Sequence, residues 1–148
     1  MKKLLGLVLL MLILISATKF ASPKPETMHT IEGAWELQSF YSYDGQDITD
    51  TLEKSDGYRQ VKMYSKGKIM WTRYVPDDPN GRFGYGSYKI TENSLIEVIE
   101  YGDDSMMKAL DTMRNFTFEL DLKDNFFSQI TLDDEGNRTS SENYKRID

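Results

Sequence analysis

Arg59 and Arg73 are the side chains of this 148-residue sequence whose type and spacing best suit binding chemistry. They stand at equal distances from the turn-forming run Ser65-Lys66-Gly67, so a hairpin with a three-residue loop places them opposite each other. Like charges that face each other across two strands repel, and desolvation without partners raises the cost. We therefore expect an anion, or open water, beside the two guanidinium groups.

That anion has two candidate sources. One is a carboxylate or phosphate group on a bound molecule, which guanidinium forks recognise well. The other is an acidic residue of the chain, with Glu97, Glu142 and the aspartates at 77–78 and 103–104 as candidates. A mouth wide enough to keep both arginines solvated is a further option. The acidic composition favours a partner within the chain over a ligand.

This sequence contains few of the residue types that catalysis or metal binding requires. It contains no cysteine and one histidine, His29, which removes thiolate sites and argues against a histidine metal site or a catalytic triad. Glu97 and Glu142 could act as an acid–base pair, but no nucleophile accompanies them, and we favour a role as ion-pair partners. No phosphate-loop, zinc or EF-hand spacing occurs. We expect no enzymatic activity, no cofactor and no metal.

The elements that must position the arginines are strands. From Gly33 onward apolar residues recur at every second position, and turn-forming clusters divide the chain into short segments. The expected strands span residues 33–43, 58–64, 68–75, 83–90, 95–101, 115–122, 126–132 and 138–147.

Two longer breaks between these strands are candidates for short helical segments. Residues 46–57 contain a run, Ile48 to Glu53, that could form a short helix. Residues 102–114 carry apolar side chains at the spacing of one helical face, namely Met106, Met107, Leu110 and Met113. We interpret that face as a packing surface rather than a ligand surface.

Eight sequential antiparallel strands predict an all-β fold, an up-and-down barrel, with an antiparallel sandwich as the alternative. Closure removes exposed strand edges, and eight strands enclose a space that side chains fill or that holds one small ligand. The longer loops, 44–57, 76–82, 102–114 and 133–137, fall at one end. We expect an open mouth there, where small molecules commonly bind.

The turns also predict which side chains face the interior. The three-residue loop places Arg59, Val61 and Met63 inside and Lys62 outside. A three-residue loop over 123–125 places Ser128 and Ile130 inside. The candidate ligand contacts are then Arg59, Arg73, Trp71, Tyr41, Tyr88 and Phe118. The aromatic members of this set could equally fill the barrel as core. Gly84 and Gly86 indicate either space inside the wall or a strand bend.

The two ends of the barrel domain should meet. Trp35 begins the first strand and Arg146 ends the last, and these strands must be neighbours if the barrel closes. The guanidinium of Arg146 can then lie over the indole and bond nearby carbonyls. Gly33-Ala34-Trp35 near the start, with Tyr144-Lys145-Arg146 at the end, resembles the Gly-x-Trp and terminal-arginine pattern of the lipocalin (calycin) superfamily.

Further segments are similar to the lipocalin-like domains of uncharacterised secreted bacterial proteins: Val61-Lys62-Met63, Lys66-Gly67, Met70-Trp71, Phe83 to Tyr88 and Ile99-Glu100-Tyr101. The resemblance covers residues 31–148. It implies a lipocalin-like barrel in which Gly33, Trp35 and Arg146 are structural. The chain departs from typical lipocalins in its shorter length, its lack of cysteine and its lack of a clear long C-terminal helix, which argues against a large cavity.

The N-terminus predicts export. Lys2 and Lys3 precede an apolar stretch that ends in small residues, which is typical of a signal peptide over residues 1–22, followed by a linker over 23–30. Fourteen apolar residues are fewer than the about 20 that span a membrane, which favours a cleaved signal peptide over the alternative of a retained signal anchor. We expect a periplasmic or extracellular protein whose membrane contact is limited to the signal peptide.

The net charge of the chain limits the classes of molecule that it can bind. Removal of residues 1–22 takes three of the 18 basic residues and leaves 15 against 24 acidic ones, a net charge of −9. Nucleic acids and anionic membranes require a basic surface, so neither is expected as a partner. The favoured hypothesis is an exported barrel that binds a small hydrophobic or amphipathic molecule, with an anionic head as one option. The alternative is a filled barrel of the cell envelope that binds another protein through its open-end loops.

Overall fold

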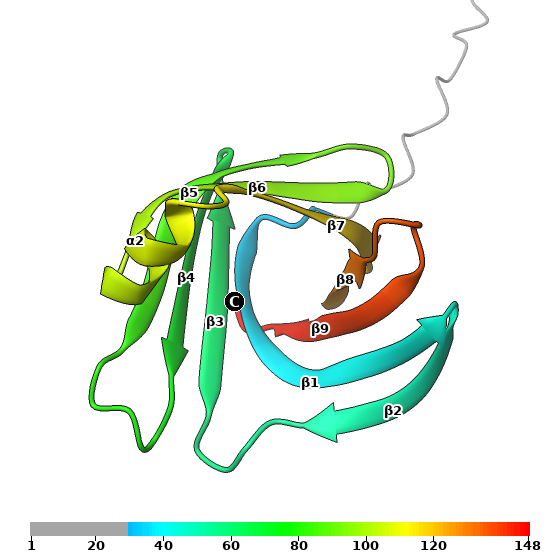
Figure 1. The fold of residues 1–148 in the computed structure, drawn as a ribbon, viewed down its shortest axis with the longest axis horizontal. Helices are drawn as coiled ribbons and strands as arrows, with labels where there is room; N and C mark the ends of the chain where they lie inside the picture. The colour runs from blue at the N-terminus through cyan, green and yellow to red at the C-terminus, as the bar shows by residue number, and fades with distance from the viewer. Residues whose placement is uncertain (1–29) are drawn as a thin grey trace, which may run out of the picture.

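Nine strands and one short helix make up residues 30–148, the part of the chain that the computed structural model describes (Figure 1). They are β1 (Gly33–Gly45), β2 (Asp47–Glu53), β3 (Arg59–Ser65), β4 (Lys68–Tyr74), β5 (Arg82–Ile90), β6 (Ser94–Gly102), α2 (Asp104–Leu110), β7 (Asn115–Leu122), β8 (Phe126–Leu132) and β9 (Arg138–Arg146). The predicted signal peptide and residues 23–29 of the predicted linker lie outside the described residues.

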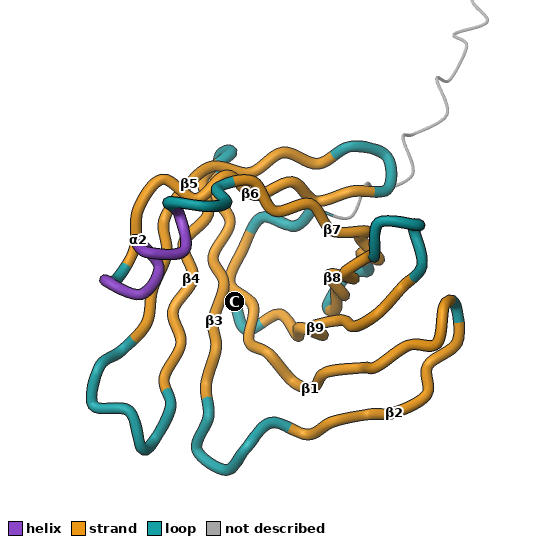
Figure 2. Tube along the Cα trace, in the orientation of Figure 1, coloured by secondary structure: helices purple, strands orange, loops and turns teal. Residues whose placement is uncertain are grey.

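Eight of these strands close into a ring, which confirms the predicted antiparallel barrel. Strands β3 to β9 pair in sequence order, and β1 pairs with both β3 and β9. Figure 2 shows the strands following one another around this ring, with the single helix against its outside. No helix within residues 30–148 is both long and apolar enough to span a membrane.

The two ends of the barrel domain meet at one end of the barrel, as the sequence predicts. Trp35 pairs with Arg146 across β1 and β9, and the guanidinium carbon lies 4.1 Å from the centroid of the indole ring. Arg146 also donates hydrogen bonds to the carbonyl oxygens of Thr30, Glu32 and Asp124. The backbone of Gly33 has a φ of +131°, and a Cβ there would collide with this guanidinium. These contacts tie the N-terminal approach, the β7–β8 turn and the last strand together.

Strand β2 corrects the prediction of a short helix over Ile48–Glu53. It pairs with the second half of β1, and all seven of its residues are exposed. Figure 1 shows it outside the ring, alongside β1. Side chains along this strand point alternately to its two faces, but Asp and Thr occupy most positions. The segment therefore lacks the apolar periodicity by which a strand is recognised in a sequence.

Helix α2 confirms the predicted helical segment within residues 102–114. It packs against β5 and β6 near the open end of the barrel, with Met106 and Leu110 buried. Met107 and Met113 are exposed. The predicted packing face is thus limited to two of its four members.

Asp103 caps this helix and connects it to the barrel. Its carboxylate accepts hydrogen bonds from the backbone N–H groups of Ser105, Met106 and Phe83, and it pairs with Arg82 at 3.0 Å. Partial burial raises the pKa of this carboxyl group, but the hydrogen bonds and the Arg82 guanidinium outweigh that effect, so the pKa lies below its usual value. The ionised carboxylate therefore stabilises the folded state.

Replacement of Asp103 with alanine should lower the free energy of unfolding by about 1–2 kcal/mol near pH 7, as loss of an N-cap does. Because the folded-state pKa is depressed, the contribution is complete above pH about 4 and disappears as the pH falls through that pKa. Urea unfolding of the wild type and the variant from pH 7 to pH 2.5 should show two stabilities that converge in acid. A gap that stays constant over this range would contradict the role of the charge.

The β3–β4 turn differs from the predicted one, and this difference reverses the faces of β3. Ser65 pairs with Lys68, so the loop is the two residues Lys66 and Gly67, both with positive φ. Arg73 is therefore opposite Gln60 rather than Arg59. The prediction that Arg59 faces the interior is wrong: its side chain is 62% exposed and pairs with Glu36 at 2.7 Å on the outside. Gln60, Lys62 and Tyr64 point inward in place of Arg59, Val61 and Met63.

Two further register changes alter the interior. A bulge between Leu37 and Ser39 turns Phe40 inward and Tyr41 outward, so the prediction that Tyr41 lines the interior is also wrong. A two-residue turn brings Phe127 opposite Leu122 and places Phe127, Gln129 and Thr131 inside in place of the predicted Ser128 and Ile130. Tyr41 instead lines a groove on the outer surface with Ile130 and Asn143.

Candidate ligand-binding site

Packed aromatic rings close the base of the barrel. Phe127 lies edge-on to Trp35 at 4.9 Å and stacks on Tyr144 at 4.7 Å, measured between ring centroids. Tyr64 meets Tyr88 edge-on at 5.0 Å in the same layer. Tyr88 is thus a partly buried residue that packs against the core at the base, and it does not line the interior space. These rings form the floor of the interior.

A layer of charged and amide side chains lies above the aromatic base. Lys62 and Glu97 are almost fully buried and form an ion pair, with the Lys62 nitrogen 3.0 and 3.2 Å from the two carboxylate oxygens. Lys62 also donates to Oε1 of Gln129 at 2.5 Å, and the Tyr64 hydroxyl donates to Oε1 of Glu97 at 2.6 Å. Each charge of this pair is surrounded by hydrogen-bonding partners, which is the condition for burying it.

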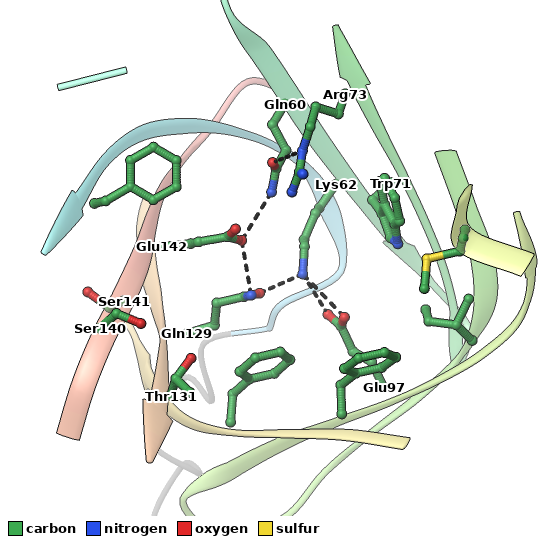
Figure 3. A pocket seen from close by; sticks show the side chains of 15 residues that line it. Gln60, Lys62, Trp71, Arg73, Glu97, Gln129, Thr131, Ser140, Ser141 and Glu142 are labelled. Atoms are coloured by element: carbon green, nitrogen blue, oxygen red, sulfur yellow. Dashed lines mark hydrogen bonds and ion pairs between the residues drawn. The ribbon is translucent and has the colours of Figure 1, made fainter. Parts of the chain in front are cut away.

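A second half of the polar layer is built on Gln60. Its amide nitrogen donates to Oε2 of Glu142 at 3.0 Å and to the Tyr144 hydroxyl. Its amide oxygen accepts from Nε of Arg73 at 2.9 Å and from the Tyr58 hydroxyl at 2.7 Å. Gln129 donates to the same oxygen of Glu142 and so joins the two halves (Figure 3).

The two buried tyrosines act here as hydrogen-bond donors. Burial, followed by the nearby carboxylates, raises the pKa of Tyr64 and of Tyr144 well above the usual value. Both hydroxyl groups therefore stay protonated, and they donate to Glu97 and Glu142 respectively. The layer needs these protons because each carboxylate is an acceptor only.

A cavity of about 370 Å³ opens above the polar layer. Its walls combine the polar side chains just described with apolar ones, namely Phe40, Trp71, Ile99, Met106, Phe116 and Phe118. Thr131 and Ser140 line it near the loop-bearing end and are exposed to solvent. The volume is at the lower end of the about 300–1,000 Å³ typical of small-molecule sites. The interior is thus filled at the base and hollow toward the mouth.

The predicted site residues separate into three groups. Arg73, Trp71 and Phe118 line the cavity, with the Arg73 guanidinium 5.8 Å from the centroid of the Trp71 ring. Arg59 and Tyr41 lie on the outer surface, and Tyr88 lies in the base. The buried polar residues Gln60, Lys62 and Gln129 were missed. The alternation of Gln60, Lys62 and Tyr64 along β3 was the available signal, since these residues share one face in either register.

Gly84 and Gly86 do not enlarge the cavity. A Cβ on Gly84 would lie 2.6 Å from Cε2 of Trp71, so the indole occupies the space that the missing side chain leaves. A Cβ on Gly86 would collide with the backbone of β6 at a bulge between Tyr85 and Gly86. The predicted space inside the wall is absent at both positions. Close approach of neighbouring groups, which was not among the predicted roles, is what excludes a side chain there.

The described residues offer no set of side chains suited to binding a metal ion. Within residues 30–148 no group of three or more His, Cys, Asp or Glu side chains is placed to hold a metal ion. The chemistry that the cavity offers is hydrogen bonding, charge pairing and contact with aromatic rings.

Comparison with solved structures identifies the architecture. A lipocalin-like protein from Bacteroides uniformis superimposes with a TM-score of 0.55 over 78% of this chain and 97% of that one, at 16% sequence identity. The chain has a lipocalin-like fold. An uncharacterized protein from Bacteroides eggerthii matches this lipocalin-like barrel with a TM-score of 0.50 over 78% of this chain and 98% of that one, also at 16% identity. No protein-family model and no curated protein matches the sequence.

Within this lipocalin-like barrel the predicted landmarks are structural. Gly33, Trp35 and Arg146 lie together at the base, on the far side of the polar layer from the cavity. The likeness at 16% identity concerns the fold, so the cavity has to be interpreted from its own residues.

Proposed function

We propose that the protein binds one small amphipathic molecule in the barrel cavity. The observation that carries this proposal is the open cavity of about 370 Å³, in which an aromatic wall faces charged groups. The wall suits an apolar body, and Arg73 suits a polar or anionic head. Binding without catalysis fits the site. Lys62 bonds to Glu97, whereas Arg73 and Glu142 each bond to the amide of Gln60. Within the described residues, none of these groups makes a hydrogen bond that would activate a serine or threonine of the wall.

The fluorescent anion 1-anilinonaphthalene-8-sulfonate provides a direct test, because it combines aromatic rings with a charged head. Its fluorescence should rise with wild-type protein and saturate. Ser140→Trp places an indole in the mouth, and should weaken the apparent affinity at least about tenfold, or 1.4 kcal/mol. Titration by fluorescence measures both values.

The matched control for that test is Thr72→Trp. Thr72 follows Trp71 on β4 and is exposed on the outer face of the barrel, so this variant adds the same ring outside the cavity. Its affinity for the dye should equal that of the wild type. Equal affinities for the Ser140→Trp and Thr72→Trp variants would place the dye outside the cavity, and absence of any saturable signal would contradict the proposal.

The proposed setting is outside the cytoplasm. The basic start, the short apolar stretch and the small residues that follow support export to the periplasm or the extracellular medium. The acidic chain supports a small molecule, rather than nucleic acid or an anionic membrane, as the partner. A bound molecule in this setting would be carried or stored rather than transformed.

A second candidate function is docking of an envelope protein on the open-end loops. The exposed strand β2 favours it, because Ile48 and Leu52 present apolar side chains to solvent and only one edge of β2 is paired. The cavity stands against it, since this function needs no hollow interior. Failure of the dye test would leave β2 as the surface to examine.

A further inference from the structure

Four charged side chains line the cavity, and their charges balance. Lys62 and Arg73 supply two cations, and Glu97 and Glu142 supply two carboxylates. A ligand with one net charge would leave an unbalanced charge in this partly desolvated space, and such a charge is costly. A ligand that carries both a cation and an anion preserves the balance.

Two of the four charges, Lys62 and Glu97, are already paired with each other. The ammonium group of Lys62 can donate three hydrogen bonds, and Glu97 and Gln129 accept them. Both oxygens of Glu97 are engaged, one by Lys62 and Tyr64 and the other by Lys62. This pair is therefore a structural floor.

The other two charges each keep one free side. Oε2 of Glu142 accepts from Gln60, Gln129 and Tyr144, whereas no hydrogen bond within residues 30–148 reaches Oε1. Arg73 donates through Nε to Gln60, and its two terminal nitrogens make no hydrogen bond or ion pair within the same residues. None of these atoms is a fully buried polar atom lacking a partner, so each contacts open space.

The amide of Gln60 holds these two groups on either side of itself. Its nitrogen bonds to Glu142 and its oxygen to Arg73, so a carboxylate acceptor and a guanidinium donor are presented side by side (Figure 3). The aromatic wall begins at once, because the Trp71 ring lies next to the Arg73 guanidinium. The cavity thus offers a negative and a positive group for the polar end of a ligand, and an aromatic wall for its apolar end.

The geometry points to a zwitterionic ligand, whose ammonium group bonds to Glu142, whose acid group bonds to Arg73, and whose apolar body lies against the aromatic wall. This inference rests on the proposed function, since it specifies the class of molecule that the same cavity binds. A fatty acid or a simple alkylamine would satisfy one half of the head site only.

Isothermal titration with three eight-carbon probes tests the inference on the wild-type protein: octanoate, octylamine and 2-aminooctanoate. We expect 2-aminooctanoate to bind at least ten times more tightly than either of the others. Equal or tighter binding of octanoate or octylamine would overturn the zwitterion assignment. If none of the three binds while the naphthalene dye still does, the assignment fails and the proposed function stands. If the dye also fails, both fail.

Two variants locate the two halves of the head. Arg73→Gln should abolish the preference of 2-aminooctanoate over octylamine, and Glu142→Gln should abolish its preference over octanoate. Arg59→Gln is the matched control, because Arg59 lies beside Gln60 on the same strand and points outward. Its preferences should equal those of the wild type. Unchanged preferences in folded Arg73→Gln or Glu142→Gln protein would overturn the assignment, and the wild-type comparison remains decisive if a variant does not fold.

Discussion

Replacement of Lys62 with methionine is expected to destabilise the protein by about 3–5 kcal/mol, the usual cost of leaving one partner of a buried ion pair without the other. Glu97 would keep the Tyr64 hydroxyl but lose its cation at a site with almost no exposure. The free energy of unfolding in urea, followed by circular dichroism, measures the loss.

Two further variants make this result specific. The double variant Lys62→Met, Glu97→Gln should recover a large part of the loss, because it removes the uncompensated charge. Lys68→Met is the matched control, since Lys68 lies on the same hairpin in an exposed pair with Glu100 and should cost less than about 1 kcal/mol. If Lys62→Met costs no more than Lys68→Met, then Lys62 faces solvent and the register of β3 described above is wrong.

The second large effect is expected at Gly86, where alanine should cost about 3 kcal/mol, at the upper end for an added methyl group in a packed region. The new Cβ would lie 2.9 Å from Cα of Ile99 and still closer to the carbonyl oxygen of Val98. Both are backbone atoms of β6, so the clash can be relieved only by moving a strand. Thermal and urea unfolding measure the effect.

Gly81→Ala is the control for that substitution. It makes the same chemical change at a loop position with no atom within 4 Å of the new Cβ, so it should stay within about 0.5 kcal/mol of the wild type. The effect of a methyl group on the unfolded chain is similar in both variants and cancels in the comparison. Equal stabilities would show that β5 and β6 do not approach as closely as described.

The sequence predicted the barrel because its strand pattern and its ends are local features. Alternation of apolar residues and turn-forming clusters located the eight strands of the ring, and Trp35 and Arg146 marked the strands that close it. Strand β2 escaped this reasoning because a fully exposed strand buries no face and so leaves no alternation to detect.

The site was harder to predict, because a change of one residue in the length of a turn reverses which side chains of an adjoining strand face the interior. Lys66 takes a positive φ of 47°, which is uncommon outside glycine, so the sequence favoured a loop with Gly67 as its single left-handed residue. The one-residue change exchanged Arg59 for Gln60 and moved Lys62 inside. The bulge after Leu37 had the same effect on Tyr41, and no residue type marks it.

Buried charge offered a second route to the register that sequence reasoning did not use. Lys62 and Glu97 lie at inward positions of β3 and β6 and neutralise each other, whereas the predicted register left two arginines inside without a defined partner. Arg73 is at an inward position of β4 in both registers. The change in turn length shifts β3 by one residue and leaves the alternation of side chains along β4 as predicted. Its partner proved to be an amide of the chain, which leaves its terminal nitrogens for a ligand.

Native mass spectrometry of the protein purified from its own host tests the central claim, that the cavity above the polar layer holds a small molecule. Wild-type protein should carry a retained molecule of defined mass, and Ser140→Trp protein prepared in the same way should carry none. A wild-type mass equal to that of the polypeptide alone, or the same adduct on both proteins, would contradict the account.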